Sequence, residues 1–124
     1  NIKEADFFAR IMKKWDEEHL YILVETYDDA HSVMYTGLNL WDGDALQVSV
    51  DPLNDGTNPE AAGSSKYRAD DYEIGFALTG AGPEAYQWYG LNTIAKGTVD
   101  WVKIIRDADT NCTKYLLARS CSCL

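Results

Sequence analysis

The sequence predicts an all-β fold: an antiparallel β-sandwich of the lectin or immunoglobulin-like kind, with about seven strands. Most patterned stretches alternate apolar and polar residues with period two, and no stretch of ten or more residues keeps an uninterrupted helical stripe. Turn-forming Gly, Asp, Asn and Pro separate these stretches at sandwich spacing. A chain of 124 residues is long enough for one core, so we expect a single domain over residues 1–124.

The first part of the chain is expected to supply a hairpin and one further strand. Strands over 5–15 and 20–28 flank a short polar connection, which indicates a hairpin. A third strand is expected over 44–51. Alternate residues of this strand would face the core: Leu46, Val48 and Val50. Trp15 and Trp101 alternate with charged neighbours and are expected in the core.

The second part begins with a long loop and continues with four strands. Residues 52–68 are rich in Asn, Asp, Gly, Pro and Ser, which is typical of a surface loop. Alternation returns at 71–78, and a glycine-rich turn then leads into a strand over 85–89. A last hairpin is expected to join 98–106 with 112–119.

The charge of the chain argues against two classes of partner. Twenty acidic and eleven basic side chains give a net charge of −9, which repels nucleic-acid phosphates and anionic membrane surfaces. No stretch reaches the roughly 20 apolar residues that span a bilayer. A neutral polysaccharide, a divalent cation or a basic protein fits this charge better.

The three cysteines lie close together near the end of the sequence. Cys121 and Cys123 are two residues apart, so they would point to the same side of a strand and could bridge each other only with strain. With Cys112 the number is odd, which leaves open one bond plus a free thiol, or an intermolecular bridge. A zinc site would need more ligands at metal spacing, and neither His19 nor His31 is nearby in sequence.

Trp41 and two polar residues form a candidate saccharide site. Trp41 precedes an acidic turn at 42–44, where its ring is either an exposed stacking surface or a plug at the end of the sandwich. Gln47 and Glu73 project outward from strands that we expect to be neighbours. They are natural partners for sugar hydroxyl groups, and they are equally compatible with ordinary solvated positions.

Tyr86 and Trp88 share one face of their strand, with Tyr89 on the other. On a solvent-facing side, they would extend the saccharide surface. The alternative is that they form the core side of an amphipathic strand, in which case Ala85 and Gln87 would face solvent.

A cluster of acidic residues suggests calcium. Asp51, Asn54 and Asp55 lie on a Gly-containing turn and offer the carboxylate and amide oxygens that Ca²⁺ prefers, without the full EF-hand pattern. The alternative is that these side chains cap their own backbone turn.

Catalytic motifs are not apparent, and we expect no enzymatic activity. The acid pairs Asp42 with Asp44 and Asp71 with Glu73 would sit in polar, solvated surroundings that leave both members ionised, whereas glycoside hydrolysis needs one protonated acid. Neither histidine has a serine or cysteine partner at a recognisable spacing.

Taken in order, several short phrases resemble the family-nine carbohydrate-binding modules, the β-sandwich domains attached to xylanases and related polysaccharide-degrading enzymes. The resemblance extends from about Ala9 to about Leu117. The phrases that carry it are Trp15-Asp16, Leu20-Tyr21, Asp28, Trp41-Asp42-Gly43-Asp44, the strand ending at Asp51, Asp70-Asp71-Tyr72-Glu73 and Thr113-Lys114-Tyr115.

The resemblance implies a secreted, non-catalytic module, part of a larger enzyme, that binds plant cell-wall polysaccharide. Its ligand would be β-1,4-glucan or xylan, or derived oligosaccharides, and it would target an attached glycoside hydrolase. Trp41 matches the tryptophan that stacks on the sugar, and Gln47 replaces the usual Glu that bonds hydroxyl groups. Structural calcium is also implied, with Asp28 and the loop acids as matching ligands.

Two departures from the family pattern stand out. Members usually continue after the Thr-x-Tyr strand with a Pro-Trp phrase and further strands that supply a second sugar-stacking ring, whereas this chain stops at Leu124. We therefore expect a domain truncated at its C-terminus. Gly75 stands where a family arginine would reach the sugar.

Two other interpretations remain open. The domain would be a protein-interaction or self-association sandwich if an open sheet edge or the C-terminal cysteines joined it into a homodimer. A cytochrome-like sandwich would need axial ligands, for which Met12, Met34, His19 and His31 are the candidates.

Overall fold

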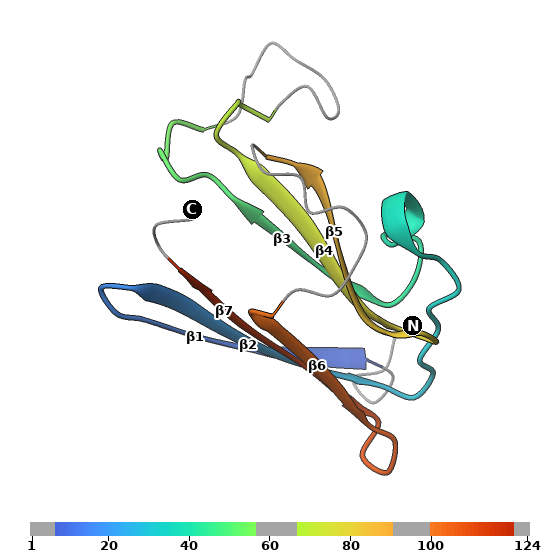
Figure 1. Cartoon of the computed structure of the whole chain (residues 1–124). Helices are drawn as coiled ribbons and strands as arrows, with labels where there is room; N and C mark the ends of the chain where they lie inside the picture. Colours follow the sequence, from blue (N-terminus) through green and yellow to red (C-terminus); the bar gives the residue numbers. More distant parts are fainter. Residues whose placement is uncertain (1–6, 57–66, 91–99, 121–124) are drawn as a thin grey trace.

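The structure, a computed structural model, describes residues 7–56, 67–90 and 100–120. These residues form two antiparallel sheets that face each other as the layers of a sandwich (Figure 1). The all-β prediction is confirmed, with seven strands and one short 3₁₀ turn among the described residues. The elements are β1 (Phe7–Trp15), β2 (His19–Asp28), η1 (Gly37–Asn39), β3 (Ala45–Val50), β4 (Tyr72–Thr79), β5 (Gly82–Tyr89), β6 (Val102–Asp107) and β7 (Cys112–Ser120).

One sheet has four strands in the order β1-β2-β7-β6, and the other has three in the order β3-β4-β5. Both predicted hairpins of the larger sheet are present. In the first turn Asp16 accepts the N–H groups of Glu18 and His19 at 2.9 and 2.7 Å. These two bonds hold the pKa of Asp16 below its ordinary value because they stabilise the carboxylate. In the second turn Asp107 accepts the N–H of Asp109 at 3.0 Å.

The core lies between the sheets and follows the predicted alternation. From β4, Ile74 and Phe76 point inward and are 4% and 1% exposed. Trp101 meets the Phe76 ring edge-on, with centroids 5.5 Å apart, so its expected place against the core is confirmed. The other buried members of the cluster are Val24, Ala85, Ile104, Tyr115 and Leu117. The inward faces predicted for the third strand are also observed, since Leu46 and Val48 pack against this cluster.

The Arg119 side chain packs against two aromatic rings at one end of the core. The Arg119 guanidinium lies 5.2 Å from the Tyr72 ring centroid and 5.1 Å from that of Trp101. It therefore contacts both sheets, because Tyr72 is in β4 and Arg119 is in β7.

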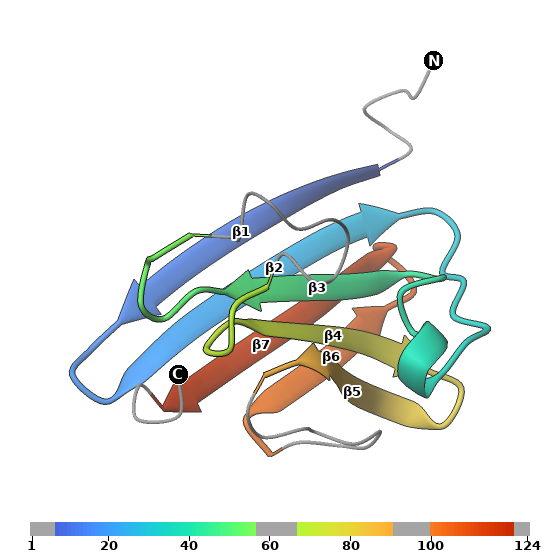
Figure 2. The ribbon, with the colours of Figure 1, turned by 90° about the horizontal axis from the view of Figure 1, so that it is seen from above.

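The prediction for Trp15 is wrong. Its side chain is 68% exposed because β1 is the edge strand of the larger sheet, and the smaller sheet does not reach over it (Figure 2). Period-two alternation shows which residues share a face of a strand, but it does not show whether a second layer covers that face.

Several strand limits also differ from expectation. β5 begins at Gly82 and not at Ala85, because Thr79 pairs with Gly82 and closes a tight turn. β6 begins at Val102 because residues 100–101 form a turn. The expected start of that strand at residue 98 lies outside the described residues.

Among the described residues, no helix has the length and apolar character needed to cross a membrane.

Candidate functional site

A groove of about 470 Å³ lies against the outer face of the three-stranded sheet. It combines four aromatic rings with one amide and one carboxylate. Its lining residues are Leu38, Trp41, Gln47, Tyr67, Glu73, Trp88 and Tyr89. Four of the five predicted saccharide-site residues therefore line one groove. Tyr86 is the exception.

Trp41 is presented to solvent by a loop that is fixed to the sheet. Gly37, which adopts the left-handed conformation with φ 60°, donates its N–H to Glu84 Oε1 at 2.6 Å. Leu40 is completely buried, whereas Trp41 is 57% exposed. The plug interpretation of Trp41 is thus wrong, since Leu40 is the side chain of this loop that fills the interior.

The Trp88 indole lies against Gly75. A Cβ atom at residue 75 would be 2.4 Å from Cη2 of Trp88 and 3.5 Å from Leu40. The indole Nε1–H donates to the carbonyl oxygen of Leu38 at 2.9 Å, which ties the ring to the loop. Glycine at residue 75 therefore gives the indole its position, and the arginine expected there in the family pattern would collide with it.

A β-bulge brings Tyr89 into the groove. Ile74 pairs with Gln87 and Glu73 pairs with Tyr89, so Trp88 is an extra residue in β5. The prediction that Tyr89 points away from Trp88 is wrong, because the bulge interrupts period two and both side chains line the same groove. The Tyr67 ring stacks on that of Tyr89, with centroids 4.6 Å apart and planes inclined by 21°.

Gln47 and Glu73 lie on neighbouring strands, as predicted. In the register of β3 and β4, Gln47 is opposite Gly75 and Ser49 is opposite Glu73, so the two polar side chains occupy adjacent rows of the same face. Gln47 is exposed and Glu73 is half-buried. Both can reach a ligand in the groove, because both contribute to its lining.

Tyr86 supports the groove from the side. It is half-buried on the outer face, opposite Gly75, and its ring meets that of Trp88 edge-on at 5.6 Å between centroids. The core interpretation of Tyr86 and Trp88 is wrong, since Ala85 and Gln87 are 2% and 3% exposed and face inward in their place.

Three lining residues were missed from the sequence: Leu38, Tyr67 and Tyr89. Tyr67 lies near the end of the predicted loop, and a single aromatic residue there forms no repeating pattern that would indicate a binding site. Leu38 precedes Leu40 in a short apolar segment, where sequence does not say which of the two is buried.

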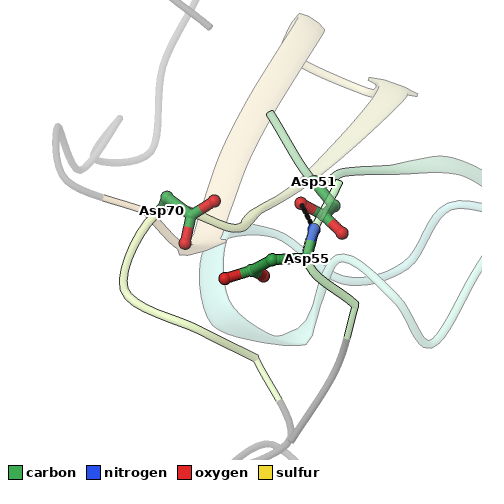
Figure 3. Close-up of side chains that lie close together, drawn as sticks. All are labelled: Asp51, Asp55 and Asp70. Atoms are coloured by element: carbon green, nitrogen blue, oxygen red, sulfur yellow. Dashed lines mark hydrogen bonds between the residues drawn. The ribbon is translucent and has the colours of Figure 1, made fainter. Parts of the chain in front are cut away.

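Three carboxylates converge at one end of the smaller sheet. Asp51, Asp55 and Asp70 each bring an oxygen within 4.8 Å of the others (Figure 3). Asp70 Oδ2 is buried and has no hydrogen-bond partner among the described residues, so a cation there would satisfy it. The donor set is purely carboxylate oxygen, which suits Ca²⁺. Arg68 already neutralises part of this charge, with Nε 3.1 Å from Asp55 Oδ1.

The other predicted calcium ligands have different surroundings. Asp28 is not part of this carboxylate group, and its Oδ1 accepts the N–H of Ala30 at 3.1 Å. Asn54 lies in the turn between the two acids, with φ 51°. Asp51 accepts the N–H groups of Asp55 and of Gly56, at 3.3 and 2.9 Å. Asp51 therefore also caps its own turn, as the alternative interpretation proposed.

Asp71 is not on a solvated face, contrary to prediction. It is 3% exposed, and its Oδ2 accepts the N–H of Arg68 at 2.6 Å. The side chain thereby closes the turn that leads into β4.

Residues 1–74 match the family model described as carbohydrate family 9 binding domain-like, and this match covers more than half of the 124 residues. The chain belongs to this family. It is thus a family-nine-like carbohydrate-binding domain, of a kind that is typically non-catalytic. The matched part of the module contains Trp41, Gln47 and Glu73, while Tyr86 and Trp88 lie beyond it. No significant match was found among curated proteins or among solved structures.

Proposed function

We propose that this module binds neutral plant cell-wall polysaccharide, β-1,4-glucan or xylan, or oligosaccharides derived from it, in the groove on the three-stranded sheet. The observation that carries the proposal is the exposed indole of Trp41 beside outward Gln47 and Glu73 in one groove. An exposed flat ring matches the C–H face of a sugar, and the amide and carboxylate match its hydroxyl groups.

The composition of the groove supports a neutral ligand. Glu73 is its one charged residue among the described lining residues. A carboxylate accepts hydrogen bonds from hydroxyl groups, but it repels the carboxylate of an acidic sugar. Trp88 and the stacked pair of Tyr67 and Tyr89 provide further ring surface along the same groove.

In this proposal the module has no catalytic role and acts as a targeting domain. It is secreted as part of a larger enzyme and holds an attached glycoside hydrolase near its polysaccharide. Tethering raises the effective concentration of the enzyme at its substrate without any new contact to the reacting bond.

The proposal includes a structural calcium ion at Asp51, Asp55 and Asp70. The ion would join the loop after β3 to the turn before β4, and it would satisfy the buried oxygen of Asp70. Both segments border strands that carry groove residues, so the ion would stabilise the supporting framework without touching the sugar.

Isothermal titration with cellohexaose and xylohexaose tests the sugar site, using Trp41→Ala and the matched control Trp15→Ala. Both indoles are largely exposed, 57% for Trp41 and 68% for Trp15, but only Trp41 lines the groove. A hexose on one face of an indole removes roughly 70 Å² of apolar surface from water, worth about 2 kcal/mol with a small stacking gain.

Trp41→Ala should therefore weaken binding by about 30-fold. Its thermal stability should be nearly unchanged, because the side chain is mostly solvated. Trp15→Ala should bind like the unaltered module. Unchanged affinity in Trp41→Ala, or an equal loss in both variants, would reject the groove as the binding site.

A further inference from the structure

β1 exposes apolar side chains along its whole length. All nine of its residues are exposed, and five of them are large and apolar. The exposed fractions are 53% for Phe7, 38% for Phe8, 69% for Ile11, 47% for Met12 and 68% for Trp15. Single exposed apolar residues are ordinary, but five large ones on a single edge strand are typical of an interaction surface.

The backbone of β1 is open as well. The strand pairs with β2 on one side, from Phe7 opposite Asp28 to Trp15 opposite Leu20, without a bulge. It ends the order of the four-stranded sheet, so within the described residues its other side has no partner strand. A long, straight edge with free N–H and C=O groups can accept another strand. In Figure 2, β1 lies beyond β3 of the facing sheet.

We infer that β1 pairs antiparallel with β1 of a second copy, in a two-fold register centred on Ile11. The sequence of the strand is self-complementary in this register. Phe7 lies opposite the partner's Trp15, and Ile11 lies opposite its own copy. The remaining pairs join Phe8 with Lys14, Ala9 with Lys13 and Arg10 with Met12.

In this register no cation of β1 lies directly opposite a cation of the partner strand. Lysine on an edge strand usually discourages pairing, and like charges directly opposite each other are destabilising. Here Arg10, Lys13 and Lys14 each face an apolar or aromatic side chain. The Phe8 ring is stacked on Tyr27, with centroids 4.2 Å apart, and the guanidinium carbon of Arg10 in the same strand lies 5.8 Å from the Phe8 centroid.

The resulting dimer has a continuous eight-strand sheet, with the order of the larger sheet repeated about the two-fold axis. The grooves lie on the other sheets of the two copies and remain free of the β1 contact. The dimer would therefore present two grooves. Because the paired strands together carry six cations, added salt should tighten the dimer.

Light scattering coupled to size exclusion, over a concentration series, tests the dimer with Ile11→Lys and its control Ile105→Lys. Both isoleucines are exposed, 69% and 49%, and both lie on edge strands of the same sheet. Ile11→Lys puts two ammonium groups directly opposite each other, so it should yield a monomer that stays folded by circular dichroism. Ile105→Lys should remain a dimer. A monomeric unaltered chain at every concentration, or equal dissociation of both variants, would overturn the inference.

Cysteine cross-linking tests the register in a background with Cys121→Ser and Cys123→Ser. Ile11→Cys brings two thiols to directly paired positions, within the Cα separation that a disulfide spans, and should give a covalent dimer without reductant. Ala9→Cys puts the thiols four residues apart and should not cross-link. Cross-linking at Ala9 with none at Ile11 would refute this pairing. The remaining thiol, Cys112, is buried and should not interfere.

Discussion

Gly75→Ala should distort the groove, although it adds only one methyl group. The added Cβ would be 2.4 Å from Cη2 and 2.5 Å from Cζ3 of Trp88, about 1 Å closer than ordinary contact. The Trp88 indole is rigid and is held by its bond to the Leu38 carbonyl at 2.9 Å. The ring must therefore lift away from the sheet and lose that bond.

The change in the free energy of unfolding has one favourable contribution and two unfavourable ones. Replacing a strand glycine by alanine in open space would stabilise the fold by about 0.5–1 kcal/mol, through the lower entropy of the unfolded chain. Overpacking costs about 1–3 kcal/mol. A lost hydrogen bond costs about 0.5–1.5 kcal/mol. The unfavourable contributions exceed the favourable one, so we expect a net loss of about 1–3 kcal/mol in the free energy of unfolding.

Urea unfolding and titration with xylohexaose together measure both consequences. Gly80→Ala is the matched control, because a Cβ there meets nothing within 4 Å and its φ is not positive. Gly80→Ala should be neutral or slightly stabilising and should bind normally, whereas Gly75→Ala should lose both stability and affinity. If Gly75→Ala were as stable as Gly80→Ala and bound as well, the account of how Trp88 is positioned would be refuted.

Three further predictions concern the loop, the core and the acid cluster. Leu40→Ala should lower the free energy of unfolding by about 2–5 kcal/mol in urea titrations and weaken glycan binding, because the completely buried Leu40 anchors the Trp41 loop. Burial, with a smaller contribution from the Asp44 charge, raises the pKa of Tyr115 from 10.0 to about 12. The protonated Tyr115 side chain therefore contributes fully to the free energy of unfolding below pH 10, and this contribution is lost between pH 10 and 12. Tyr115→Phe should therefore lose less stability than the unaltered chain between pH 9 and pH 12, by about 2–3 kcal/mol in urea titrations. Millimolar Ca²⁺ should raise the melting temperature of the unaltered chain in calorimetry, and Asp70→Asn should remove most of that increase, whereas an equal increase in both would contradict the proposed ion.

Much of the fold could be predicted because strand alternation is a local property. The inward positions of β3 and β4 follow from period two alone, and so does the outward direction of Gln47 and Glu73. Antiparallel neighbours then bring these two polar residues into adjacent rows. For this reason four of the five predicted saccharide-site residues line one groove.

The errors concern properties that depend on distant parts of the chain. Trp15 has the same alternating neighbours as a core residue, but strand order leaves β1 uncovered. Tyr89 lines the groove because a bulge shifts the pairing of β4 with β5, and the three residues of the bulge, Gln87, Trp88 and Tyr89, include no Gly or Pro. Asp71 is buried because its carboxylate closes a turn onto Arg68, which alternation cannot reveal.

The central claim is that the outer face of the three-stranded sheet binds the glycan. The four tryptophans of the chain allow a direct measurement, because each indole N–H gives one signal in a ¹H–¹⁵N spectrum. Titration with cellohexaose and xylohexaose should shift the signals of Trp41 and Trp88, which line the groove, and leave those of Trp15 and Trp101 in place. Saturable shifts confined to Trp15 or Trp101, or no shift at millimolar ligand, would contradict the claim.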